Sequence, residues 1–302
     1  MKALVTGGAG FVGRHLVREL AKRKIKTIVF DQVNPVDDRE GKIPGCKYVT
    51  GDILDLDSLI KATKGCNLVF HTAAIAEIDE ARKNPVRTMN VNVMGTVNCL
   101  EAARACSVKR FLYASSVYAS GNRGSFYRVS KLTGESLCKT YFEDFGLQYT
   151  ILRYGSLYGR EPNHWNFIYG VCRDLLTTGE FTYTSSPDAI REYIHINDAA
   201  RETVRIAFDD DFANRSVLIT GHQRLKMKEF FDMIEEILGK KIKVRYESSR
   251  HHRHYIRTPY SFDVDVPTRI NLSSYVDISE GILDCLHEIK SEIKKENDEF
   301  IE

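Results

Sequence analysis

The sequence lacks several features that would assign it to a specialised class of protein. No Cys-x-x-Cys pair occurs among its seven cysteines, and no apolar run approaches the roughly 20 residues that a membrane span needs. Lys and Arg number 43 against 41 Asp and Glu, and the two kinds are interleaved along the chain. The resulting net charge of +2 gives no reason to expect nucleic-acid binding.

The cysteines and the first strand predict the compartment. The cysteines are odd in number and widely spaced, which is typical of buried thiols in a reducing environment. An apolar strand starts at residue 2 and leaves no room for a signal peptide. We therefore expect a cytoplasmic protein with no membrane partner.

Repeats, low-complexity linkers and a complete set of metal ligands are also missing. The run His251-His252-Arg253-His254 is the only histidine cluster, but its adjacent side chains point in different directions and no carboxylate or cysteine completes a set. We therefore expect no metal. With 302 residues, the chain is long enough for one large domain and a smaller one.

A glycine-rich turn follows the first apolar strand directly. The residues are Thr6-Gly7-Gly8-Ala9-Gly10-Phe11-Val12-Gly13, and helical spacing continues to Lys22. Gly7 can take backbone angles closed to other residues, Gly10 lets the main chain approach a pyrophosphate, and Gly13 lets the helix pack on the strand. Together with Phe11 and Val12 at the helix N-terminus, they predict a dinucleotide-phosphate site.

Asp31 ends the second expected strand, Thr27 to Phe30, where a carboxylate can accept hydrogen bonds from an adenosine ribose. The same carboxylate would repel the extra phosphate of NADP, so Asp31 favours NAD, although Arg39 and Lys42 lie close in sequence. The alternative is that Asp31 only caps a turn.

Strands and helices alternate along the first half of the chain, which predicts an α/β fold with a doubly wound parallel sheet of the Rossmann type. The remaining expected strands are Lys47 to Thr50, Leu68 to His71, Phe111 to Ser115, Tyr149 to Arg153 and Val217 to Thr220. We expect an NAD-binding domain at 1–155 plus about 190–222. A smaller, mostly C-terminal substrate-binding domain is expected at about 156–189 plus 223–302.

Two long helical stretches, around 86–105 and 127–145, carry small and apolar residues on more than one face. A helix-to-helix contact in a homodimer is one explanation.

Tyr127 and Lys131 are four residues apart, so on a helix they share one face. A nearby ammonium and the positive ring of an oxidised nicotinamide would both favour the phenolate, so Tyr127 is a candidate general base. Ser116 ends the strand just upstream and is the candidate to hydrogen-bond the reacting oxygen. Taken alone, the spacing is more typical of a plain amphipathic helix surface.

With these residues in place, nearly the whole chain resembles the extended short-chain dehydrogenases/reductases, specifically the NAD-dependent epimerase/dehydratase family acting on nucleotide sugars. The matching segments are the glycine turn, Gly51-Asp52-Ile53, His71-Thr72-Ala73-Ala74, Asn92-Val93-Met94-Gly95-Thr96, Tyr127 with Lys131, Leu152 to Gly159, and Arg191 to Asp198.

The resemblance implies roles for further residues. Asp52 and Ile53 would contact the adenine, Ala73 would line the cofactor channel, Asn92 would belong to the cofactor site, and Lys131 would also hold the nicotinamide ribose. Arg191 would bind the diphosphate of the sugar nucleotide, unless it forms a surface salt bridge with Glu192 or Asp188. Ser156 stands where the family usually has an asparagine that touches the substrate.

Two residue types that related enzymes carry near the active-site serine are missing here, and their absence restricts the type of reaction. Related dehydratases place an acidic residue at or next to the position after the active-site serine, whereas Val117 and Tyr118 follow Ser116. Related 3,5-epimerases use a cysteine near that position, and none lies between Cys106 and Cys138. The segment between Ser116 and Tyr127 is also shorter than is common in the family.

We therefore expect a nucleotide-sugar 4-epimerase, with a UDP-sugar as the favoured substrate and a transient 4-keto intermediate. The alternatives are a nucleotide-sugar 4-dehydrogenase, reductase or dehydratase, and a non-catalytic NAD(H) sensor.

Overall fold

A seven-stranded parallel sheet organises the computed structural model, which describes residues 1–33, 42–121, 123–160, 163 and 165–247. From edge to edge the strands are β10 (Arg215–Ile219), β6 (Tyr149–Tyr154), β5 (Arg110–Ser116), β4 (Leu68–His71), β1 (Lys2–Thr6), β2 (Lys26–Asp31) and β3 (Cys46–Thr50). The strand order reverses between β1 and β4, and ligands of such sheets bind beyond the carboxyl ends at that point. The predicted doubly wound sheet is confirmed.

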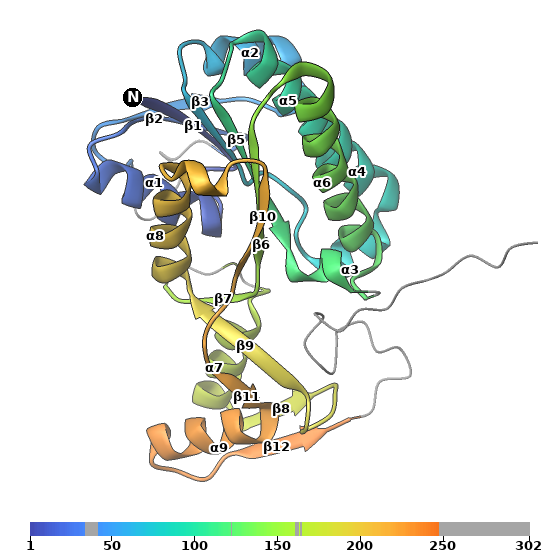
Figure 1. Ribbon diagram of the computed structural model, residues 1–302. Helices are drawn as coiled ribbons and strands as arrows, with labels where there is room; N and C mark the ends of the chain where they lie inside the picture. Colours follow the sequence, from blue (N-terminus) through green and yellow to red (C-terminus); the bar gives the residue numbers. More distant parts are fainter. Residues whose placement is uncertain (34–41, 122, 161–162, 164, 248–302) are drawn as a thin grey trace, which may run out of the picture. The chain divides into compact units, whose positions relative to one another are not determined.

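Helices cover both faces of this sheet (Figure 1). One face carries α1 (Phe11–Lys22) and α8 (Ile196–Ala207), and the other carries α2 (Leu56–Thr63), α5 (Gly95–Ala105) and α6 (Ser125–Phe145). Successive residues of β1 point to opposite faces, so Leu4 packs in the core under α2 and α5 while Ala3 and Val5 pack in the core under α1. Burial on both faces explains why these strands are continuous apolar runs.

The helix expected at 86–105 is interrupted. It consists of α4 (Pro85–Met89), a π-helical turn η2 (Asn90–Met94) and α5, preceded by the short α3 (Ile78–Lys83). The π turn contains Asn92, whose buried side chain bonds to residues of two other segments. A single turn of this kind is common at functional sites.

Beyond Gly155 the chain builds two smaller sheets. In the first, β9 (Ile190–His195) pairs with β7 (Ser156–Tyr158) and β11 (Arg224–Lys226), and in the second β8 (Glu180–Tyr183) pairs with β12 (Lys243–Tyr246). They share a separate apolar core with α7 (Phe167–Thr177) and α9 (Met227–Leu238). Thus β9 lies outside the seven-stranded sheet, although its residues fall in the range expected for the first domain. Residues 248–302, including the His251–His254 run, lie outside the described residues.

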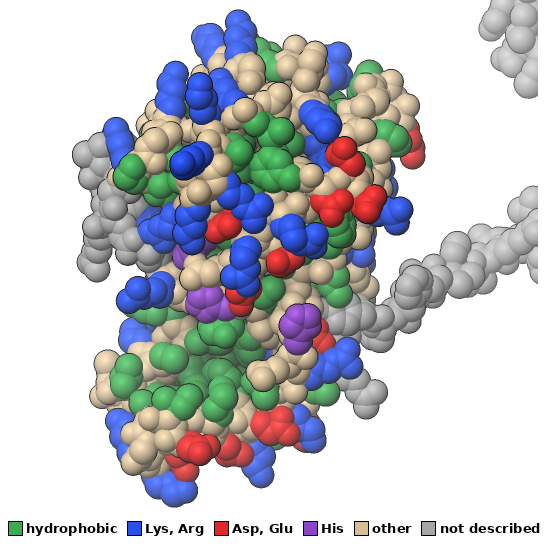
Figure 2. All heavy atoms as spheres, turned by 60° about the vertical axis from the view of Figure 1, so that its left-hand side comes forward, with side chains coloured by type: hydrophobic (Ala, Val, Ile, Leu, Met, Phe, Trp, Pro, Cys, Tyr) green, Lys and Arg blue, Asp and Glu red, His purple; other side chains and the backbone are tan. Residues whose placement is uncertain are grey.

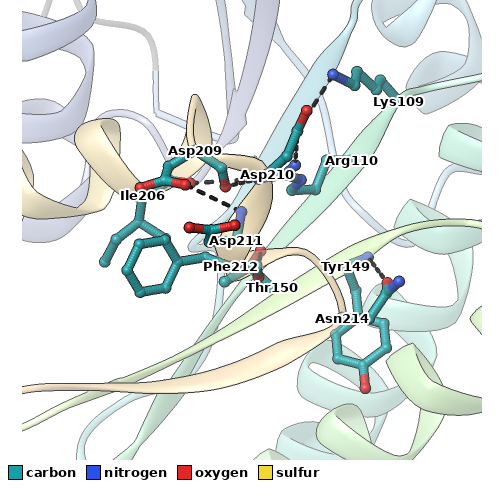
Figure 3. A network of polar contacts seen from close by, with 10 residues as sticks. All are labelled: Lys109, Arg110, Tyr149, Thr150, Ile206, Asp209, Asp210, Asp211, Phe212 and Asn214. Carbon is teal, nitrogen blue, oxygen red and sulfur yellow. Dashed lines mark hydrogen bonds and ion pairs between the residues drawn. The ribbon is translucent and has the colours of Figure 1, made fainter.

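A buried arginine fastens α8 to the amino-terminal edge of the sheet (Figure 3). Arg110, only 1% exposed at the start of β5, donates to the carbonyls of Ile206 and Asp209, at 3.4 and 2.8 Å. Its guanidinium also pairs with Asp210 of the short helix η4 (Asp210–Phe212), as does Lys109. The network lies at the amino-terminal ends of the strands, opposite the carboxyl ends where the site is expected.

On one face of the molecule, charged and hydrophobic side chains are distributed unevenly (Figure 2). Basic and acidic side chains are interleaved over the upper part, and hydrophobic side chains gather in the lower part. Among the described residues, no helix combines the length and apolar character needed to cross a membrane.

Candidate active site

The glycine turn between β1 and α1 has the geometry that its sequence predicts. Gly7 has a φ of +69°, and a Cβ on it would lie 2.5 Å from the backbone nitrogen of Ala73. A Cβ on Gly13 would lie 2.1 Å from the carbonyl oxygen of Gly7. Both positions therefore require glycine, and α1 starts against the turn with Gly10 as its N-cap.

A cavity of about 1140 Å³ opens in front of this turn, beyond the carboxyl ends of β1, β2 and β4. Six residues predicted to bind the cofactor lie in its wall: Gly7, Gly10, Asp31, Asp52, Ile53 and Ala73. Phe11 and Gly13 are buried behind the turn, where they hold α1 against the sheet, and Val12 is partly buried. A glycine cradle that a Cβ would fill, in front of a cavity with a carboxylate at the end of β2, fits a dinucleotide.

Asp31 caps a turn and also lies at the cavity wall. Its carboxylate accepts hydrogen bonds from the backbone N–H of Ala9 in the glycine turn and of Val33, both at 3.0 Å, and it also lines the cavity. The side chain therefore caps a turn and is held at the cavity wall. Of the two basic residues nearby in sequence, Lys42 lies over the ring of Tyr48, and Arg39 falls outside the described residues.

Asn92 is placed behind the cavity. Its amide accepts from the N–H of Ile75 at 2.7 Å, donates to the carbonyl of Ile75 at 3.0 Å and donates to Ser130 Oγ at 2.9 Å. The side chain is 1% exposed. It therefore ties the loop after β4, which lines the cavity, to helix α6. Its neighbours Asn90 and Val91 reach the cavity wall.

The three predicted catalytic residues meet at the carboxyl end of β5. Ser116 ends β5 and hydrogen-bonds the phenol of Tyr127, and Lys131 Nζ lies 5.7 Å from the centroid of the Tyr127 ring. The same ammonium donates to the carbonyl of Ala114 at 2.7 Å and lies 5.2 Å from the ring centroid of Tyr113. The helical spacing of the tyrosine and the lysine therefore produces the cluster that the sequence predicts.

Burial dominates the electrostatics of this cluster. It lowers the pKa of Lys131 from 10.5 to about 8 and raises the pKa of Tyr127, which the hydrogen bond from Ser116 partly offsets. Burial, with the charge of Lys131, lowers the pKa of His71 to about 3. His71 is therefore neutral, with Thr6 and Thr96 as its hydrogen-bond partners. Lys131 supplies a cation beside the Tyr127 ring.

The two predicted substrate residues lie on neighbouring strands of the smaller sheet. Ser156 begins β7 beside Tyr193 of β9, and Arg191 lies two residues before Tyr193. Arg191 is 8% exposed and donates to the carbonyl of Ile190 at 2.9 Å. Of the carboxylates considered as its surface partners, Glu192 pairs with Arg224 at 2.7 Å and Asp188 pairs with Lys226 at 3.4 Å.

Several residues at the site do not follow from the sequence patterns. Lys83, Arg87 and Asn163 lie in the cavity wall, and the first two are cations four residues apart on either side of Pro85. Glu135 lies one helical turn after Lys131, on the same face of α6 as Tyr127 and Lys131. This four-residue spacing is the sequence pattern from which its place at the site could have been predicted.

Comparison with known proteins agrees with this geometry. Residues 3–219 match the family described as "NAD dependent epimerase/dehydratase family". A Methanocaldococcus jannaschii protein, provisionally named a UDP-glucose 4-epimerase, is 27% identical over 297 residues, which span 92% of this chain and 95% of that protein.

Solved structures share the fold. A UDP-glucose 4-epimerase from Thermotoga maritima with UDP-glucose superposes with a TM-score of 0.74 at 24% identity, covering 83% of this chain and 86% of that chain. A dTDP-glucose 4,6-dehydratase double mutant from Streptomyces venezuelae with NAD bound gives a TM-score of 0.76 at 26% identity, covering 87% and 88%. Epimerases and dehydratases thus both resemble this chain.

Proposed function

Because the chain belongs to the NAD-dependent epimerase/dehydratase family, with NAD as its cofactor, we propose that it is a nucleotide-sugar epimerase that inverts C4 of the sugar. The observation that carries the proposal is the Ser116, Tyr127 and Lys131 cluster at the carboxyl end of β5, together with the lack of Asp and Glu in the sequence 117–126 that connects Ser116 to Tyr127.

The missing carboxylate favours epimerisation over dehydration. Residues 117–126 contain no Asp or Glu, so the segment after Ser116 has no carboxylic acid to protonate a leaving hydroxyl. Glu135 is the first carboxylate in the sequence after this segment, but it is 1% exposed and accepts two hydrogen bonds from Arg153 and one from Ser115. A carboxylate held in this way is not free to act as the elimination acid.

The chain's own residues would move one proton. Ser116 would hydrogen-bond the C4 hydroxyl, and Tyr127 would remove its proton while Lys131 stabilises the phenolate. Bound NAD supplies the acceptor and the return of a hydride, so the cycle has no net redox change. The 4-keto sugar would then turn, and Tyr127 would return the proton to the epimeric oxygen.

We propose a UDP-sugar as the substrate. The bound UDP-glucose of the Thermotoga maritima structure supports a nucleotide sugar. In this chain Arg191 would supply a planar cation for the diphosphate, and Ser156 would supply a hydroxyl for the sugar.

We also propose that the chain forms a homodimer through α6 and the helical segment at 86–105. The exposed apolar side chains Phe126, Val129 and Leu132 follow each other along α6, and Met94 is exposed on the adjoining η2. Since α6 packs against α4, η2 and α5, these side chains belong to one helical layer. A second copy of this layer would bury the apolar stripe.

The test is incubation of the purified protein with a panel of UDP-, GDP- and CDP-sugars, without reductant, while products are followed by NMR and NADH by absorbance. We expect a C4 epimer without accumulating NADH. A keto sugar with stoichiometric NADH would instead establish a dehydrogenase, and an absence of conversion would favour the sensor.

Tyr127→Phe should lower kcat by roughly 10²- to 10⁴-fold, because general acid–base catalysis contributes that much. Tyr141→Phe is the matched control on the same helix, since it removes a phenol bonded to Glu101 rather than to Ser116. A near-normal rate in Tyr127→Phe would exclude the proposed base.

A further inference from the structure

One face of α6 carries the proposed catalytic pair and then a carboxylate. Tyr127, Lys131 and Glu135 follow each other at four-residue spacing, so each side chain lies one turn after the previous one. Glu135 is 1% exposed and is the only acidic residue of α6 that is buried. A buried carboxylate one turn from a buried ammonium acts on its charge state.

Glu135 is held from the sheet side by two strands. Arg153 of β6 donates to it from Nε at 2.9 Å and from Nη2 at 2.6 Å, and Ser115 Oγ of β5 donates at 2.5 Å. Ser115 and Arg153 are direct partners in the β5–β6 register, and Ser115 precedes the proposed catalytic Ser116. The remaining nitrogen of Arg153 donates to Ser120 in η3 (Val117–Ser120) at 3.0 Å. The ion pair and its hydrogen bonds therefore connect α6, which carries Tyr127 and Lys131, to β5, which carries Ser116, and to the turn η3 that follows β5.

Four other ionisable groups of the described residues lie near the Tyr127–Lys131 pair or near Glu135. They are His71 of β4, Tyr113 of β5, Tyr118 of η3 and Cys138 of α6. Burial lowers the pKa of His71 to about 3 and raises the pKa of Tyr113 and of Cys138. Among these described neighbours, Glu135 and Arg153 are the charged groups.

We propose that Glu135 and Arg153 are positioning residues that set the protonation of the Tyr127–Lys131 pair through opposite charges, a role that rests on the proposed function of that pair. Glu135 stabilises the ammonium of Lys131 against its burial, and Arg153 limits that effect by neutralising the carboxylate. The bidentate contact fixes α6 relative to β6, and the hydrogen bond from Ser115 fixes it relative to β5, so that Tyr127 stays within hydrogen-bonding reach of Ser116.

The two charges give the proposal a signature that a structural role lacks. Glu135→Gln removes a negative charge, so the pair loses its protons more easily and both limbs of the pH–rate profile should move to lower pH. Arg153→Gln removes a positive charge, so both limbs should move to higher pH. For unit charges about one helical turn away and partly screened, each shift should be about one pH unit.

The experiment measures kcat against pH for both single variants and for the double variant Glu135→Gln/Arg153→Gln. The double variant changes no net charge, so its profile should return toward that of the unchanged protein even if its kcat is lower. Opposite shifts with this return support the proposal. Shifts in one direction, or profiles that keep their midpoints while kcat falls, would overturn it.

Two further variants separate charge from folding. Arg153→Lys keeps the charge and loses the bidentate contact, so it should lower kcat and keep the profile; it also carries the test if Glu135→Gln fails to fold. Asp210→Asn removes one negative charge, as Glu135→Gln does, but beside Arg110 at the other end of β5, which the rise of the strand places about 20 Å away. It should leave the pH–rate profile unchanged.

A measurement without substrate keeps the proposal separate from the proposed function. The tyrosinate absorbance of Tyr127 is followed against pH in the NAD complex as the difference from Tyr127→Phe. Opposite displacements of this titration in the two single variants would support the positioning role even if no nucleotide sugar turns over. Unmoved titrations would refute it even in an active epimerase.

Discussion

Lys131 should make the folded protein less stable near neutral pH, and the size of the effect follows from its burial. Its side chain is 5% exposed, and burial lowers its pKa from 10.5 to about 8. Between these values the unfolded chain binds a proton that the folded chain does not, so stability rises with pH across that window. Below about pH 8 both states are protonated and the full penalty is present.

The perturbation is Lys131→Met, which keeps an unbranched side chain of similar length and removes the charge. The difference of 2.5 between the two pKa values corresponds to a penalty of about 3 kcal/mol at low pH. From about pH 7 to about pH 10, the protein with Lys131 should gain about 2.5 kcal/mol of unfolding free energy relative to the variant. Loss of the hydrogen bond to the Ala114 carbonyl changes the offset between the two curves but not this pH dependence.

The assay is urea unfolding of both cofactor-free proteins at a series of pH values, because taking the difference cancels the titrating groups that do not interact with Lys131. The variant should also lose activity, since it lacks the cation beside Tyr127. Parallel stability curves across this pH range would refute the reasoning, because they would show that the ammonium of Lys131 is not buried at a cost.

Two substitutions test other parts of the structure. Gly7→Ala places a Cβ 2.5 Å from Ala73 N at a φ of +69°, so calorimetric titration should show NAD affinity reduced by tenfold or more, whereas Gly45→Ala, at a φ of +80° with open space around it, should bind NAD normally. Val129→Glu adds a charge to the exposed stripe of α6 and should convert the proposed dimer to a monomer in light scattering, whereas Ile237→Glu on α9 should not; an unchanged mass for Val129→Glu would place the interface elsewhere.

The large sheet could be predicted because its strands are recognisable one at a time. The residues of β4 and β5 are all buried, so each strand is a short apolar run between helices, and that pattern survives without knowledge of its partners. The smaller sheets escaped prediction because β7 and β11 have only three residues each, none of them fully buried. Such strands depend on β9, a partner far away in the sequence, and local periodicity carries no information about it.

The same distinction applies within the site. Tyr127 and Lys131 meet because of helical spacing, which the sequence contains, and Ser116 follows from the end of a predictable strand. Arg153 reaches Glu135 only because the β5–β6 register sets Arg153 beside Ser115. The π turn at Asn92 likewise depends on hydrogen bonds to loops that are distant in sequence.

The short connection between Ser116 and Tyr127 has a consequence for substrate choice. Gly124, at a φ of +113°, and Ser125, at +53°, turn the chain directly into α6, and a Cβ on Gly124 would lie 2.9 Å from the Tyr118 ring. The Tyr118 ring packs edge-to-face against the ring of Tyr127. The turn therefore holds the proposed base in place without a longer loop. Because the connection between Ser116 and Tyr127 is short, we expect the groups that select the sugar to come mainly from other segments. We expect them on β7 and β9, where Ser156 and Arg191 lie.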